Sequence, residues 1–116
     1  MTESCVFCDI VAGKFGTKFL YEDDDVVAFS DLHAVAPSHV LVVPREHFAD
    51  LPAVSASRNP TGVLGKLLNV AAKMGESAIK DGGYRVVINS GPQAGQTVFH
   101  LHLHVMAGRH FAWPPG

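Results

Sequence analysis

The chain has 116 residues, of which 47% are hydrophobic and 17% are charged, and its formal net charge at pH 7 is −2. This length fits one domain, residues 1–116, with enough apolar side chains for a compact core. The balanced charge argues against broad nucleic-acid binding, and no apolar run approaches the roughly 18 residues of a membrane span. Because the beginning of the chain also does not resemble a signal peptide, we expect a cytoplasmic protein.

The first part of the chain predicts a short helix followed by three strands. Residues 5–12 carry apolar side chains at helical spacing. The β-rich runs 19–22 and 26–30 flank three consecutive aspartates and predict a hairpin. Residues 39–43 predict a third strand, which Pro44 ends.

The second part predicts one long helix and two further strands. Residues 50–62 contain two prolines and predict a loop. Apolar residues at a spacing of three to four over 63–79 predict the main amphipathic helix. Residues 84–89 and 100–106 predict two strands. Five strands with one long and one short helix indicate an α+β fold on an antiparallel sheet.

Three histidines alternate with apolar residues in the segment His-Leu-His-Leu-His-Val-Met, residues 100–106. Alternate residues of a strand share a face, so the three imidazoles would line one side and the apolar residues the other. No Asp, Glu, Lys or Arg stands between Val86 and Gly108, which is typical of an interior segment. Because burial disfavours the charged form, an imidazole held there stays neutral and nucleophilic.

A polar loop, residues 89–97, comes directly before this segment. Gly91 and Gly95 allow tight turns, and the amides, hydroxyls and carboxamides around them can donate hydrogen bonds. Such a loop can hold an anion without a lysine. In contrast, His33 and His110 stand alone, and we interpret them as hydrogen-bonded core residues.

Cys5 and Cys8 form a Cys-x-x-Cys pair near the beginning of the chain. In a cytoplasmic protein this spacing indicates metal or redox chemistry more often than a structural disulfide. The pair supplies half of a tetrahedral metal site. Two buried thiols without a metal are the alternative interpretation.

Four segments of the chain together resemble the histidine triad (HIT) family, and in particular its Hint branch of purine nucleotide-binding hydrolases. They are the His-x-His-x-His motif with its two following apolar residues at 100–106, the preceding Gly-Gln-Thr-Val-Phe at 95–99, residues 36–45, and the ending Trp-Pro-Pro-Gly at 113–116. Several segments in the right order are more specific than one short motif. The resemblance implies a HIT-like α+β fold with a five-stranded antiparallel sheet, and a homodimer whose long helices pair.

The resemblance also implies a reaction, the hydrolysis of an adenosine or guanosine 5′-phosphoramidate to the nucleoside monophosphate and an amine. His102 would attack phosphorus and form a nucleotidyl-histidine intermediate. His104 would manage the proton of the departing group, with His39 nearby in the hydrogen-bond network. The remaining residues placed around the nucleotide are Asn89, Gly95, Gln96 and Thr97 at the phosphate, Asp31 at the ribose, and Val6, Phe7, Ile10, Phe29 and Leu32 around the base.

Some members of the family complete the cysteine pair with two histidines, and the matching positions in this chain are His47 and His100. Two thiolates and two imidazoles form a closed, tetrahedral and structural zinc site. In that case His100 is a metal ligand and does not donate a proton.

Three alternatives to this activity remain. The triad histidines could bind a catalytic zinc ion that activates water. The protein could be a nucleotide-binding regulatory protein with little turnover. It could also cleave dinucleoside polyphosphates, as in the Fhit branch of the family.

Overall fold

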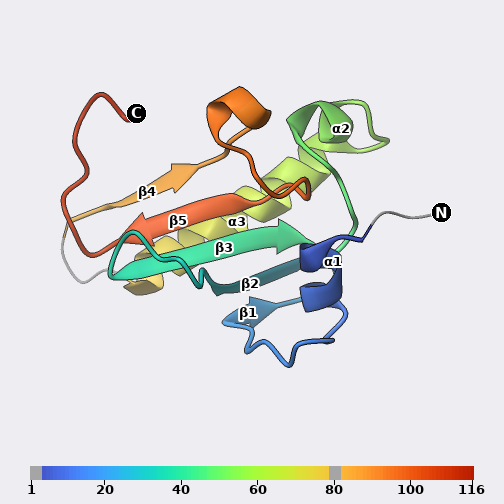
Figure 1. Cartoon of the computed structure of the whole chain (residues 1–116), viewed down its shortest axis with the longest axis horizontal. Coiled ribbons are helices and arrows are strands. Elements are labelled where there is room, and N and C mark those ends of the chain that lie inside the picture. Colours follow the sequence, from blue (N-terminus) through green and yellow to red (C-terminus); the bar gives the residue numbers. More distant parts are fainter. Residues whose placement is uncertain (1–3, 79–81) are drawn as a thin grey trace.

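A five-stranded antiparallel sheet forms the centre of the protein in this computed structural model, which describes residues 4–78 and 82–116 (Figure 1). The strand order is β1-β2-β3-β5-β4. The strands are β1 (Tyr21–Glu22), β2 (Val26–Ser30), β3 (Ser38–Pro44), β4 (Tyr84–Val87) and β5 (Leu103–Ala107), and the helices are α1 (Val6–Val11), α2 (Leu51–Ser55), α3 (Pro60–Ala78) and a 3-10 turn at Pro92–Ala94.

The two faces of the sheet pack against different helices. The long helix α3 covers one face, where its Leu67 and Val70 pack with alternate residues of the central strands. The opposite face packs against Phe7 of the short helix α1. Successive strand residues point to opposite faces of the sheet, and each face packs against a helix. The central strands are therefore nearly continuous hydrophobic runs.

The α+β fold with five antiparallel strands is confirmed, as is the short helix near residues 5–12. The hairpin is confirmed too, because β1 pairs with β2 in an antiparallel register. Its second strand has the predicted bounds, and its first is shorter than predicted. The apolar residues that alternate with the triad histidines, Leu101, Leu103 and Val105, all lie in the core on the α3 side, as expected.

The prediction of a loop at 50–62 is wrong, because α2 and the first turn of α3 lie within this segment. Asp50 caps α2 by accepting a hydrogen bond from the amide of Ala53 at 3.0 Å. Both prolines stand in the first turn of a helix, Pro60 as the first residue of α3. A first-turn residue needs no amide donor, so these prolines begin helices and do not break them. The predicted helix end at residue 79 lies outside the described residues.

The last strand begins at Leu103, and the prediction of a strand from residue 100 is wrong for its first three residues. There the backbone leaves the ladder, since the amide of Leu101 donates to the carbonyl of Phe48. Likewise, β4 ends at Val87 and not at residue 89. The interpretation of His33 and His110 as core residues is also wrong, because both side chains are exposed.

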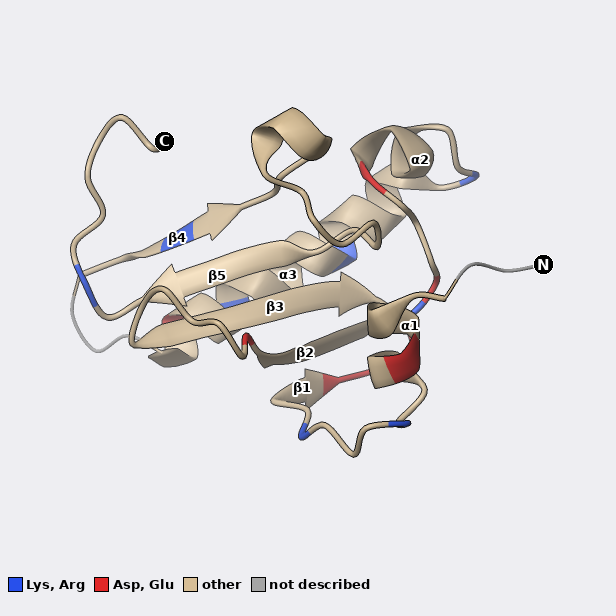
Figure 2. Ribbon diagram, in the orientation of Figure 1, with Lys and Arg blue, Asp and Glu red and all other residues tan. Residues whose placement is uncertain are grey.

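Charged residues lie mainly at the ends of elements and in loops, while the central strands β3 and β5 carry none (Figure 2). This distribution agrees with the uncharged stretch expected to be interior. None of the helices in residues 4–78 and 82–116 combines the length and apolar character that crossing a membrane requires.

Candidate functional site

Three histidine rings lie together on the α1 side of the sheet. In the antiparallel pair β3 and β5, His39 lies opposite Met106 and His104 lies opposite Leu41, so the two histidines are diagonal neighbours on one face. Their ring centroids are 5.2 Å apart. The ring of His102, just before β5, lies 5.0 Å from that of His104.

The backbone determines which nitrogen of His102 carries the proton. Its Nδ1 lies 2.8 Å from the carbonyl oxygen of His100, and a carbonyl can accept a hydrogen bond but not donate one. Nδ1 therefore holds the hydrogen, and the lone pair of the neutral ring is on Nε2. His102 is thus held in the form in which Nε2 is nucleophilic.

A second backbone contact determines the tautomers of His39 and His104. The amide of Val35 donates to Nδ1 of His39 at 3.1 Å, so the hydrogen of His39 is on Nε2. That nitrogen lies 2.9 Å from Nδ1 of His104 and 3.3 Å from Oδ2 of Asp31. When His39 donates to His104, the remaining hydrogen of His104 is on its Nε2, where it can be offered to a ligand.

The close approach of Asp31, His39 and His104, with ligand atoms within 4.8 Å of one another, could also suit a metal ion. The amide of Val35 disfavours that use. A metal on Nε2 of His39 would place the ring hydrogen on Nδ1, where it would face the amide hydrogen of Val35. The cluster is therefore better described as a hydrogen-bonded relay.

His104 is neutral over the physiological range. Its burial, together with the neighbouring His102 and His39, lowers the pKa of His104 from 6.5 to about 4, although Asp31 acts in the opposite direction. A neutral His104 is consistent with its role as acceptor from His39. The sequence-based expectation of uncharged imidazoles in this segment is confirmed for this residue.

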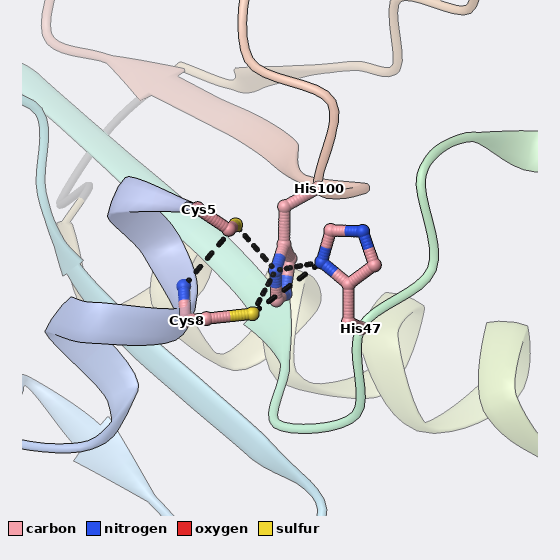
Figure 3. A group of neighbouring side chains, drawn as sticks. All are labelled: Cys5, Cys8, His47 and His100. Carbon is pink, nitrogen blue, oxygen red and sulfur yellow. Dashed lines mark hydrogen bonds between the residues drawn. The ribbon is translucent and has the colours of Figure 1, made fainter. Parts of the chain in front are cut away.

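A second cluster lies beside the rings of His39, His102 and His104 and consists of Cys5, Cys8, His47 and His100 (Figure 3). Nδ1 of His100 lies 3.4 Å from Sγ of Cys5, 3.5 Å from Sγ of Cys8 and 3.2 Å from Nδ1 of His47. Zinc bonds of about 2.0 Å to nitrogen and about 2.3 Å to sulfur place tetrahedral ligand atoms roughly 3.3 to 3.8 Å apart. The spacing of the four atoms is therefore close to that of a zinc site.

The hydrogen bonds around the cluster fit a metal as well. Nε2 of His100 lies 2.8 Å from the carbonyl of Pro44, so it donates there and leaves the Nδ1 lone pair for the cluster. Metal-ligating histidines commonly donate their other nitrogen in this way. Burial, followed by the neighbouring Cys5, raises the pKa of the Cys8 thiol to about 11 in the metal-free protein, and binding a cation would displace that proton. We assign the cluster as a structural zinc site with four protein ligands.

The polar loop 89–97 is held in shape by Gln96, whose side chain is buried. Its Oε1 accepts from the amide of Gly91, and its Nε2 donates to the carbonyls of Ala49 and Val98. The backbone amides of Gly95 and Gln96 also donate to carbonyls within the loop. In the structure these donors shape the loop, and the expected contact of Gly95 and Gln96 with phosphate stays a prediction.

Two other loop residues still have donors to offer. Within the described residues, the side chains of Asn89 and Thr97 make no hydrogen bond. Asn89 lies against Gly95, where an added Cβ would be 3.7 Å from its Nδ2. Gly95 has a φ of +95°, a conformation that glycine adopts without strain.

The residues expected around the base differ in exposure. Phe7 and Phe29 are buried and meet edge to face at 5.7 Å. Ile10 packs beside them, while Val6 is 45% exposed and Leu32 is 95% exposed. An apolar floor with an exposed apolar rim is suited to a flat, aromatic ligand.

Sequence reasoning missed the backbone groups of this site. The amide of Val35 and the carbonyls of Pro44 and His100 select the tautomers of three histidines, and no side-chain pattern signals such contacts. It also missed the buried position of Gln96, although the uncharged surroundings of that residue were a usable signal.

Comparison with known proteins shows which family this chain resembles over most of its length. A family model described as the HIT domain matches residues 13–111. A 14 kDa zinc-binding protein from Zea mays is 37% identical over 111 residues, which cover 96% of this chain and 87% of the relative.

Two solved structures share the fold over most of their length. The HIT family hydrolase from Legionella pneumophila has a TM-score of 0.90 at 34% identity and covers 97% of this chain and 100% of its own. The zinc-bound histidine triad family protein from Mycobacterium smegmatis has a TM-score of 0.81 at 34% identity, with coverage of 91% and 76%. The extent of these matches, together with the clustered histidines, shows that this chain belongs to the HIT family.

Proposed function

We propose that the chain is a nucleotide-binding hydrolase that cleaves purine nucleoside 5′-phosphoramidates to a nucleoside monophosphate and an amine. The observation that carries this proposal is the pair of complementary tautomers at the centre of the site. His102 has a free lone pair on Nε2, while the neighbouring His104 has a hydrogen on Nε2. A nucleophile beside a proton carrier is the minimum for a two-step displacement at phosphorus.

In the first step, Nε2 of His102 attacks phosphorus and the P–N bond to the amine breaks. The negative charge of the bound phosphate raises the proton affinity of His104, which takes up one proton from solvent as the substrate binds and then donates its Nε2 hydrogen to the leaving nitrogen as the P–N bond breaks. The product is a nucleotidyl group on Nε2 of His102. The Nδ1 hydrogen of His102, held by the carbonyl of His100, stays in place throughout.

In the second step, water attacks the same phosphorus and gives a proton to His104, and the bond to His102 breaks. This releases the nucleoside monophosphate and restores the lone pair on His102. When the product and its negative charge leave, His104 returns this proton to solvent and is neutral again. His39 acts as a positioning residue because its Nε2 hydrogen orients His104 through Nδ1.

The nucleotide would lie along the α1 side of the sheet. Asn89 and Thr97 would donate to the phosphate together with His104. Asp31, whose Oδ1 already accepts from the amide of His33 at 2.8 Å, would accept from the ribose hydroxyls through its other oxygen. The apolar residues described above, Val6, Phe7, Ile10, Phe29 and Leu32, would enclose the purine.

A homodimer fits the exposed surface of the isolated chain. Among the described strands, β4 is the last in the sheet order and has an open edge. Leu68 on α3 is 50% exposed, and Trp113 in the C-terminal segment is 83% exposed. A second copy that pairs with β4 and α3 would cover this apolar surface.

Rapid mixing with adenosine 5′-phosphoramidate, followed by intact-mass analysis, tests the mechanism. We expect a transient nucleotidyl adduct that maps to His102. The His102→Ala variant should lose the adduct and the turnover while still binding adenosine monophosphate, and His110→Ala, an exposed histidine outside the triad, serves as the matched control. Full turnover by His102→Ala would refute the assignment, and faster cleavage of a dinucleoside polyphosphate would overturn the substrate class.

A further inference from the structure

His100 takes part in two groups of contacts at once. Its ring belongs to the Cys2His2 cluster, where Nδ1 lies within 3.5 Å of both thiols and of Nδ1 of His47. Its backbone carbonyl accepts the hydrogen bond from Nδ1 of His102 at 2.8 Å. The side chain of His100 is completely buried, so the position of its ring and that of its carbonyl are closely linked.

The helix α1 makes a second connection between the two sites. Cys5 and Cys8 bracket Phe7, whose ring meets His102 edge-on at 5.0 Å and His100 at 6.0 Å. A helix of six residues is not stable by itself and depends on tertiary anchors. In the structure its anchors are the two cysteines, facing His47 and His100, and the buried ring of Phe7.

We propose that the Cys2His2 cluster is a positioning device for the nucleophile, so that metal ligation by His100 and α1 holds the His102 ring in its reactive orientation. The inference rests on the proposed role of His102. With the four ligands bound, the carbonyl of His100 and the ring of Phe7 confine His102 from two sides. Without ligation both supports loosen, while the separate core between the sheet and α3 keeps the chain folded.

A matched pair of variants at His47 separates metal ligation from the loss of an imidazole. His47 is exposed, and within the described residues no hydrogen bond or ring contact joins it to His102, so its replacement removes none of the groups proposed to react. His47→Ala removes one ligand. His47→Cys removes the same imidazole but supplies a thiolate. His47 faces the cluster through Nδ1, which is the ring nitrogen nearer the backbone. The sulfur of a cysteine at this position therefore lies close to where Nδ1 lies now and can bind the metal in its place. Val54→Ala, in the core on the α3 side, controls for general destabilisation.

Three experiments are made on each full-length variant: a zinc determination, steady-state kinetics that give kcat and KM with adenosine 5′-phosphoramidate, and the imidazole ¹H–¹⁵N spectrum of His102. We expect the His47→Ala protein to lose zinc. Its kcat should fall about 10- to 100-fold, with a much smaller change in KM. The spectrum of His102 should change from the single Nδ1–H form to a mixture of the two tautomers. His47→Cys should recover zinc and most of the lost kcat. Val54→Ala should keep the Nδ1–H form.

A zinc-free His47→Ala protein that keeps both its kcat and the Nδ1–H form of His102 would overturn the proposal. If that variant does not fold, the wild type before and after removal of zinc by a chelator takes its place, and a zinc-free protein that keeps the Nδ1–H form of His102 would likewise overturn it. The spectrum requires no turnover. If the wild type does not cleave the phosphoramidate, the proposed function fails, while the His102 spectra still decide the positioning role.

Discussion

Acidification should destabilise the folded protein through His104, and the size of the effect follows from its environment. Burial lowers the pKa of His104 from 6.5 to about 4. As the pH falls, the unfolded chain therefore binds a proton on this residue before the folded chain does. The contribution of the neutral ring to stability is complete above about pH 6.5 and is lost as the pH falls toward 4.

The gap between the two pKa values corresponds to about 3 kcal/mol in full, of which about 2 kcal/mol falls between pH 7 and pH 5. This is a large part of the stability of a small domain, which is typically about 5–15 kcal/mol. The zinc ligands also bind protons in acid, so the pH dependence of the wild type alone does not isolate His104. A His104→Gln variant does, because it keeps the zinc site and loses only this titration.

Urea unfolding followed by far-ultraviolet circular dichroism, at pH 7, 6 and 5 with zinc present, measures the difference. Fluorescence is a poor probe because Trp113 is already 83% exposed in the folded chain. We expect the free energy of unfolding to fall by about 2 kcal/mol less in His104→Gln than in the wild type between pH 7 and pH 5. Parallel curves for the two proteins would refute the reasoning.

Three further predictions concern the loop, the long helix and the metal. Gln96→Ala should lower the free energy of unfolding by about 2 kcal/mol, measured in urea, because buried backbone groups lose their partners. Gly75→Ala should lower the free energy of unfolding by about 1–3 kcal/mol, because its Cβ would clash with the ring of Tyr84. Gly65→Ala in the same helix meets open space and should stabilise the isolated chain by up to about 1 kcal/mol. Equal shifts in Tm for the two variants would contradict this reasoning. Zinc affinity, measured by competition with a chromophoric chelator, should rise from pH 6 to pH 8 because the Cys8 thiol must lose its proton, and a flat profile would argue against thiolate ligation.

Patterns within short stretches of sequence were the most informative about the fold. The strand 26–30 and the alternation of apolar residues at 101, 103 and 105 follow from side-chain periodicity, and both appear in the structure as predicted. The same local reasoning failed at 50–62, where prolines were interpreted as helix breakers. Whether a proline begins or breaks a helix depends on its position relative to the cap, and here Asp50 supplies that cap.

The sequence by itself determined which residue types are available: alternating imidazoles in an uncharged segment, and a pair of thiols that needs further ligands. Resemblance to a family identified His47 and His100 as those ligands, and the fold brings His100 to Cys5 across 95 positions. Only the tertiary structure decided the protonation of each ring, because the deciding partners are backbone groups. The carbonyl of His100 and the amide of Val35 reach their histidines through the path of the chain, and a backbone amide or carbonyl is the same at every non-proline residue.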